Sequence, residues 1–229
     1  MSEEFDKAYW EGRYRGHTPV GSGQPNPQLV AEVGDFAPGT ALEAGCGEGA
    51  NAIWLASRGW RVTAVDLAST ALHRAREHAE TLGTDVTSRI DWVQADLTVW
   101  TPTEEHFDLV CAHYVHPAAS REVLFRRLAA SVAPGGTLLI VDHHPSHSHT
   151  STAHTSTPHT STPHTSTPHT STAHASAPTV HITAEEIAAS LDPDRWDIAV
   201  AEARTRTATA PHGHEITFHD TVLRARKHP

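Results

Sequence analysis

Strand-like and helix-like segments alternate along most of this chain, and this alternation restricts its possible folds more than any other feature. The expected strands span residues 40–43, 61–66, 90–95, 107–112 and 137–141. The expected helices span residues 5–12, 27–33, 50–58, 69–82 and 120–132. Strands that alternate with helices form a parallel sheet that is covered by helices on both faces. The pattern therefore predicts an α/β fold.

The end of the chain follows a different pattern. A capping box at Thr183 and Glu186 predicts one more helix. Two further strands, residues 196–206 and 215–226, have no helical segment between them, so they can pair as an antiparallel hairpin. The complete prediction is a seven-stranded, mostly parallel sheet with helices on both faces and a C-terminal antiparallel hairpin at one edge.

A low-complexity segment interrupts this pattern at residues 143–178. It contains only His, Thr, Ser, Pro and Ala, and its histidines recur every five residues from His144 to His174. A period of five matches neither a helix nor a strand, and the segment has no apolar face to bury. We predict a disordered or polyproline-like insertion loop. It divides one domain into residues 1–142, with N-terminal lid helices and the first five strands, and residues 179–229.

Charge and composition exclude several classes of protein. The chain has 17 basic and 27 acidic residues and a net charge of −10, which disfavours binding to nucleic acid or to anionic lipid. Its apolar runs are much shorter than the ~20 residues of a membrane span, and no secretory signal is visible. The two cysteines, Cys46 and Cys111, suit a reducing compartment and small packing roles. We therefore expect a cytoplasmic protein without a nucleic-acid or membrane partner.

Three candidate ligand groups follow three consecutive strands. The run Glu43-Ala-Gly45-Cys-Gly47-Glu-Gly49 lies between the first strand and the next helix, where glycines allow close backbone approach to a ligand. Asp66 ends the second strand, where a carboxylate can accept both ribose hydroxyls, and Asp96 with Leu97 follows the third. Together these groups predict a nucleoside site.

The stretch from Ala41 to Ala56, with Val62-Thr-Ala-Val-Asp66, resembles class I S-adenosylmethionine-dependent methyltransferases. The resemblance covers nearly the whole chain outside the insertion and implies a Rossmann-like fold. The N-terminal Tyr9-Trp10-…-Tyr14 and the stretch Gly-Glu-Gly-x-Asn-Ala are more specifically similar to the thiopurine and tellurite-resistance branch. The activity implied is methyl transfer to a small-molecule acceptor, a thiol or another chalcogen nucleophile.

The resemblance also implies roles for individual residues. Around the methionine part, the ribose and the adenine of S-adenosylmethionine, and above the bound cofactor, it places Trp10, Glu43, Gly45, Cys46, Gly47, Asp66, Leu67, Asp96, Leu97 and His113. Trp10 matches an aromatic residue that covers the cofactor. His113 stands where thiopurine enzymes have an arginine that contacts the cofactor, so this chain departs from that branch there.

Catalytic candidates lie near the carboxyl ends of the fourth and fifth strands, where open parallel sheets bind ligands. They are His113, His116 and His143. A thiol needs only modest help to ionise, whereas an oxygen nucleophile needs a committed base. Both acceptor classes, and nitrogen acceptors, stay open at this point.

The histidines also suggest metal binding. His143, His144, His147 and His149 are dense enough to chelate zinc, nickel or copper, at least adventitiously. One alternative is therefore a metal-handling protein on a methyltransferase-like scaffold. A weaker alternative is a nicotinamide-dependent oxidoreductase, because Gly45, Gly47 and Ala50 also fit a dinucleotide-binding pattern.

Overall fold

The computed structural model describes residues 6–16, 23–117, 120–145, 182–209 and 215–229. The predicted insertion, residues 143–178, lies outside the described residues from residue 146 onward. The helices are α1 (Lys7–Arg15), α2 (Pro27–Val33), α3 (Ala50–Ser57), α4 (Ser69–Thr81), α5 (Thr84–Thr87), α6 (Arg121–Ser131) and α7 (Ala184–Ala189). The strands are β1 (Thr40–Ala44), β2 (Arg61–Asp66), β3 (Ile90–Gln94), β4 (Phe107–His113), β5 (Val132–His143), β6 (Trp196–Thr209) and β7 (Glu215–Lys227).

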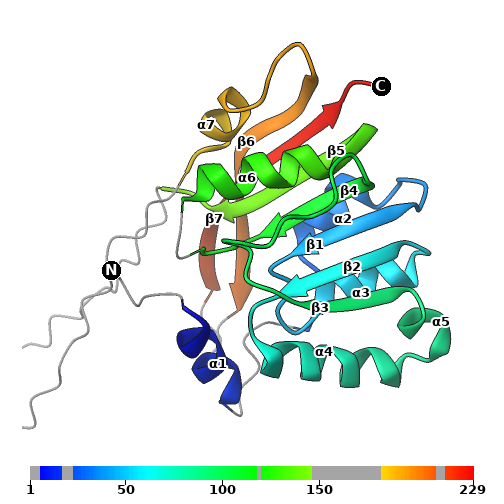
Figure 1. Ribbon diagram of the computed structural model, residues 1–229. Coiled ribbons are helices and arrows are strands. Elements are labelled where there is room, and N and C mark those ends of the chain that lie inside the picture. The colour runs from blue at the N-terminus through cyan, green and yellow to red at the C-terminus, as the bar shows by residue number, and fades with distance from the viewer. Residues whose placement is uncertain (1–5, 17–22, 118–119, 146–181, 210–214) are drawn as a thin grey trace, which may run out of the picture.

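The seven strands form one sheet in the order β3-β2-β1-β4-β5-β7-β6 (Figure 1). The first five strands in this order are parallel, and β7 runs antiparallel to both β5 and β6. The predicted fold class is thus confirmed, including the hairpin at the edge. The parallel pairing of β1 with β4 matters most for the site, because it brings the two loops that follow these strands side by side.

Two apolar clusters cover the two faces of the sheet. One joins the sheet to α2, α3 and α4 through residues such as Leu29, Leu55 and Leu72. The other joins it to α6 and α7 through residues such as Leu128 and Ile187. Burial of such side chains contributes about 1.5–3 kcal/mol each, so both faces are firmly fixed and the strand ends form a rigid platform. Figure 1 shows α1 next to the edge at which β1, β2 and β3 end.

Three local predictions differ from the structure. Ser69 was expected to cap α4, but the N-cap is Ala68 without a side-chain cap, and Ser69 is the first helical residue. The Ser69 N–H donates instead to Glu11 of α1, a partner far away in the sequence. The short α5 was not predicted. The fifth strand begins at Val132 rather than at residue 137, because a register irregularity opposite β4 accommodates the proline and glycines that precede residue 137.

Candidate functional site

A cavity of about 950 Å³ opens at the carboxyl ends of the parallel strands. This volume lies at the upper end of the range of about 300–1,000 Å³ that is typical of small-molecule sites. Its walls come from α1, the loop before α2, the glycine-rich loop after β1, the ends of β2, β3 and β4, the end of β5, and the β6–β7 hairpin. One cavity therefore collects residues from almost every part of the described chain.

The loop after β1 is shaped for close approach. Gly45 and Gly47 have φ angles of +73° and +53°, in the left-handed region that other residues rarely adopt. A Cβ atom on Gly45 would lie 2.7 Å from Val115 Cγ2, and one on Gly47 would lie 2.9 Å from the Tyr14 hydroxyl oxygen. Only glycine fits both positions, and the loop backbone is left open to the cavity.

Asp66 holds this loop in place. Its Oδ2 accepts a hydrogen bond from the Gly47 N–H at 2.8 Å, and its Oδ1 accepts one from the Ala68 N–H at 2.9 Å. Burial raises the pKa of the Asp66 carboxyl, and these backbone donors oppose the shift. Each oxygen still has a lone pair, so the carboxylate can accept two further hydrogen bonds from a ligand in the cavity.

A second carboxylate lines the cavity after β3. Asp96 Oδ1 accepts hydrogen bonds from the backbone and hydroxyl of Thr98, at 2.8 and 2.7 Å. Its Oδ2 has no hydrogen-bond partner among the described residues and is an available acceptor. Leu97, only 9% exposed, lines the cavity beside it. An acceptor next to an apolar surface suits a flat polar ring.

Glu43 forms a buried cluster with His113 and Asn51. Glu43 Oε1 accepts hydrogen bonds from Asn51 Nδ2 and from His113 Nδ1, each at 2.9 Å. Because the carboxylate accepts a hydrogen bond from the Nδ1–H group, the His113 Nε2 atom carries the lone pair when the ring is neutral. Among the described residues, His113 Nε2 and Glu43 Oε2 are buried and have no hydrogen-bond partner. His113 and Asn51 line the cavity; Glu43 lies beneath it.

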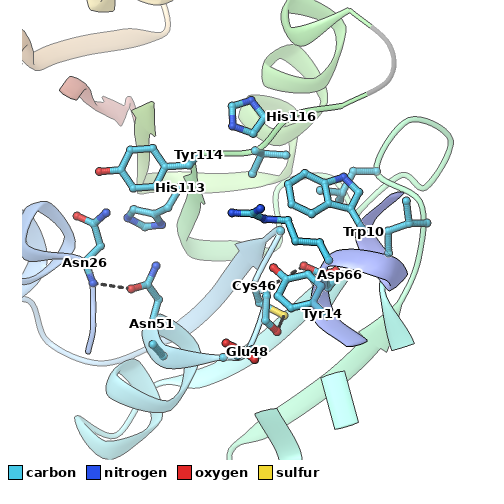
Figure 2. Close-up of a pocket in the computed structure, with 18 of the residues that line it drawn as sticks. Trp10, Tyr14, Asn26, Cys46, Glu48, Asn51, Asp66, His113, Tyr114 and His116 are labelled. Carbon is cyan, nitrogen blue, oxygen red and sulfur yellow. Dashed lines mark hydrogen bonds between the residues drawn. The ribbon is translucent and has the colours of Figure 1, made fainter. Parts of the chain in front are cut away.

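Figure 2 shows these groups on opposite sides of the pocket. His113, Asn26 and Asn51 gather on one side, and Trp10, Tyr14 and Asp66 lie on the other. The Asn26 N–H donates to Asn51 Oδ1 at 2.8 Å, which connects the loop before α2 to the start of α3.

The helix α1 covers one side of the cavity and is attached through Glu11. The Glu11 carboxylate accepts hydrogen bonds from the backbone N–H and the hydroxyl of both Ser69 and Thr70, at distances from 2.6 to 3.3 Å. These donors lower the pKa of Glu11 to about 2. The carboxylate thus supplies the cap that α4 lacks and holds Trp10 against the cavity.

Four aromatic and imidazole rings that line the cavity form a stack. The ring of Trp10 lies nearly parallel to that of His116, with centroids 6.4 Å apart, and His116 is nearly parallel to His143 at 6.0 Å. His143 in turn stacks on Tyr114 at 4.6 Å. Tyr114 has a φ angle of +52°, an unfavourable backbone conformation for a bulky residue. The structure therefore holds this ring against the local backbone preference.

Arg121 determines the protonation of His116. The guanidinium forms an ion pair with the buried Asp142 and donates from Nη2 to His116 Nδ1 at 2.6 Å. Arginine has no acceptor, so His116 Nδ1 must carry a lone pair and the proton of the neutral ring must sit on Nε2. In this arrangement neither nitrogen of His116 is available to remove a proton. Burial raises the pKa of the Asp142 carboxyl to about 6, although Arg121 opposes this shift.

Most predicted site residues meet in this one cavity. It is lined by Trp10, Gly45, Cys46, Gly47, Asp66, Leu67, Asp96, Leu97, His113, His116 and His143. Burial raises the pKa of the Cys46 thiol well above its usual value, so it is neutral at ordinary pH. Sequence reasoning assigned no site role to five further lining residues, Tyr14, Asn51, Tyr114, Arg206 and Phe218. Asn51 belongs to the quoted glycine-loop stretch and Tyr114 directly follows β4, so both could have been found.

The metal prediction receives no support from the described part of the chain. His147 and His149 lie outside it, and its residues contain no group of three or more His, Cys, Asp or Glu side chains that could hold a metal. His144 lies beyond the cavity lining and donates its backbone N–H to His219. No helix in the described ranges is long and apolar enough to cross a membrane.

Comparison with known proteins identifies the family. A family model described as a methyltransferase domain matches residues 41–136, the segment that carries the glycine-rich loop, Asp66 and Asp96. This segment is a class I S-adenosylmethionine-dependent methyltransferase domain. The resemblance expected from the sequence is thus confirmed.

Two curated relatives are similar to this chain. A 2-heptyl-1-hydroxyquinolin-4(1H)-one methyltransferase of Mycobacteroides abscessus is 30% identical over 155 residues, which are 62% of this chain and 66% of the relative. A probable thiol methyltransferase 2 of Arabidopsis thaliana is 28% identical over 144 residues, 61% of this chain and 62% of the relative. The chain therefore spans just under two thirds of the length of these relatives.

Two solved structures share the fold. One is described as the conversion of a disulfide bond into a thioacetal group during echinomycin biosynthesis; its TM-score is 0.67 at 23% identity, and the match covers 97% of this chain and 91% of the other. The structure of TehB from Haemophilus influenzae gives 0.60 at 16% identity, covering 96% and 66%.

Proposed function

We propose that this protein transfers a methyl group from S-adenosylmethionine to the sulfur atom of a small-molecule thiol or a related chalcogen nucleophile. When bound, the cofactor supplies an electrophilic methyl group, which passes to the acceptor as the sulfonium becomes a thioether. The observation that carries the proposal is the set of acceptor groups at the ends of β1, β2 and β3, together with the open glycine loop.

The donors and acceptors present fit this cofactor. Asp66 would accept the two ribose hydroxyls, and Asp96 with Leu97 would hold the adenine. His113 Nε2, which is buried at the cavity wall without a described partner, is an acceptor when His113 is neutral. It matches the ammonium group of the methionine part, and the negative charge of Glu43 beneath it would favour the same cation. In this proposal Glu43 acts partly through His113, whose tautomer it determines.

The protein's own contribution is positioning and exclusion of water. Trp10 on α1 would close the cavity over the ligands. His116 and His143 would form part of the wall that contacts the methyl acceptor, because their rings are stacked against neighbouring rings. His113 would face the cofactor.

The unavailability of His116 as a base favours sulfur as the acceptor atom. A thiol with a pKa near ~8.5 ionises with little help, whereas a hydroxyl group does not. His116 Nδ1 is already bonded by Arg121. The similarity to a probable thiol methyltransferase supports the same choice, whereas the hydroxyquinolinone methyltransferase shows that a relative with another kind of acceptor exists.

Calorimetry with S-adenosylhomocysteine tests the cofactor assignment. We expect micromolar binding that weakens at least about tenfold in Asp66→Ala, because charged hydrogen bonds are lost. The exposed Asp91→Ala on β3 is the matched control and should bind like the unmodified protein. Equal binding by Asp66→Ala would exclude this site.

A screen with labelled cofactor against thiols, selenols, tellurite and hydroxylated compounds then tests the acceptor. Activity on oxygen acceptors alone would contradict the sulfur assignment.

For the histidine-rich segment, residues 143–178, we propose only binding of zinc, nickel or copper in vitro. Imidazole suits these ions, and the high histidine content of the segment supports adventitious chelation. Deletion of residues 146–178 should remove most zinc binding and leave the affinity for S-adenosylhomocysteine unchanged. Zinc binding that survives this deletion would indicate a site around His143 and His144.

A further inference from the structure

The acceptor end of the cavity contains an arginine that the proposed methyl transfer does not use. Arg206 of β6 lines the cavity and is paired in register with Phe218 of β7, which also lines it. The guanidinium carbon lies 4.2 Å from the centroid of the Phe218 ring and 5.7 Å from that of Tyr114. The guanidinium is therefore within cation–π distance of two aromatic rings, which stabilise it.

The orientation of Arg206 is set by Asp220. Arg206 Nε donates to Asp220 Oδ2 at 2.9 Å, and the Asp220 side chain is fully buried. Asp220 also accepts hydrogen bonds from the Tyr114 hydroxyl at 2.9 Å and from Gln28 Nε2 at 3.4 Å. Side chains from three parts of the fold therefore contact this carboxylate. They fix its position, and the carboxylate in turn fixes the Arg206 Nε atom.

This arrangement leaves the end of the guanidinium available. Asp220 is bonded only through Nε, and the two Nη atoms of Arg206 have no hydrogen-bond partner among the described residues. Two parallel N–H groups in a fixed plane match the two oxygens of a carboxylate, which they bind bidentately. Because Arg206 lines the cavity and neither of its Nη groups is used, these two groups are available to bind a ligand.

The neighbouring wall indicates what the rest of that ligand is like. The stacked rings of Trp10, His116, His143 and Tyr114 run along the same cavity, and Tyr114 is the ring that contacts Arg206. Such a wall packs against a flat, unsaturated body, and offset ring pairs contribute about 0.5–1.5 kcal/mol beyond area burial. The anion-binding fork and the flat wall meet at Tyr114.

Resting on the proposed function, we infer that the methyl acceptor is an organic acid, and that Arg206 selects it by binding its carboxylate while its flat body packs on the ring stack. Arg206 is then a specificity-determining residue that contacts the substrate. Asp220 is a positioning residue that acts through Arg206 and Tyr114.

The test compares two probes that differ by one carboxylate, 2-mercaptobenzoate and thiophenol. Each is titrated by calorimetry into protein saturated with S-adenosylhomocysteine, so that the measurement does not require turnover. We expect the carboxylate probe to bind about 10–100-fold more tightly, as for a bidentate charged pair. In Arg206→Gln this preference should disappear, and affinity for thiophenol should change less than threefold.

Two further variants keep the test decisive. Arg206→Lys retains a cation beside the buried Asp220 but has no fork, so it should fold and still lose most of the preference. Arg226→Gln is the matched control, because Arg226 lies on the adjacent strand β7, is exposed, donates to the Gly135 carbonyl and is not part of the cavity lining. It should retain the full preference.

Each other outcome contradicts the inference. Equal binding of the two probes to the unmodified protein, no binding of 2-mercaptobenzoate, or a carboxylate preference that survives in Arg206→Gln would each overturn it. Weaker binding of S-adenosylhomocysteine to Arg206→Lys would assign Arg206 to the cofactor instead. Failure of the unmodified protein to bind S-adenosylhomocysteine would overturn the proposed function itself and is recognised before either probe is added.

Discussion

The two ends of the cavity are built from different kinds of groups. The end near β1, β2 and β3 presents backbone and carboxylate acceptors. Asp66 is held by hydrogen bonds from the loops after β1 and β2, and Asp96 by one from its own loop. The end near β4, β5 and β7 presents aromatic and imidazole rings, with Arg121 and Arg206 each paired to a buried carboxylate. The first end suits one ligand of fixed polarity. The second suits a flat ligand whose identity depends on a few side chains.

The two ends also differ in how they are fixed. The glycine loop is held by bonds between residues that are close in the fold's central strands, and its shape depends on backbone conformation. The ring wall depends on side chains from α1, β4, β5 and the hairpin, which are joined through Glu11, Arg121 and Asp220. Changes at the first end should therefore abolish binding, and changes at the second should modulate it.

The largest effect is expected for Gly45→Ala. The new Cβ would lie 2.7 Å from Val115 Cγ2 at a φ angle of +73°, so the loop must shift. We expect affinity for S-adenosylhomocysteine, measured by calorimetry, to fall about 100-fold or more. Gly83→Ala is the matched control, because Gly83 has a φ angle of +96° but nothing within 4 Å. It should lose stability without losing affinity, and a similar loss in both variants would contradict the role of the loop.

This difference between the two ends also explains what could be predicted from the sequence. Gly45, Gly47 and Asp66 were identified because they lie at or shortly after the ends of β1 and β2, and parallel strands bring their carboxyl ends together. The same reasoning found His113 and placed His116 and His143 near the cavity. The order of strands along the chain is therefore sufficient to predict those site residues that the sheet itself positions.

Residues that act across long sequence distances could not be predicted. Glu11 bonds Ser69, which is 58 residues away, and this partner explains why the expected cap at Ser69 was wrong. Arg206 meets Phe218 through the register of a hairpin, and register depends on turn geometry that the sequence does not specify. Glu43 was expected to face the cofactor directly, and its burial beneath Asn51 and His113 depends on side-chain packing.

A smaller effect is expected from acid at the acceptor end. Burial raises the pKa of Asp142 from 3.8 to about 6, so folding favours its protonated form. The stabilisation from this proton is present at low pH and is lost as the pH rises from about 3.8 through about 6. Relative to Asp142→Asn, the unmodified protein should lose about 1–3 kcal/mol of unfolding free energy over that interval, measured by urea denaturation. The control Asp91→Asn should show no such trend, and a flat difference for Asp142→Asn would contradict the assignment.

A comparable effect of the opposite sign is expected at Glu11. Hydrogen bonds from Ser69 and Thr70 lower the pKa of Glu11 from 4.5 to about 2, so its stabilisation is present above pH 4.5 and is lost as the pH falls toward 2. Near neutral pH, Glu11→Gln should reduce the unfolding free energy by about 1–3 kcal/mol, and the difference should shrink as the pH falls through this interval. The exposed Glu80→Gln on α4 is the control and should change little. Hydrogen exchange should also speed up in α1 of Glu11→Gln while the strands keep their protection. Equal exchange in α1 of both variants would mean that the lid is held by Trp10 and Tyr14 alone, and would remove the carboxylate from the connection between the two ends of the cavity.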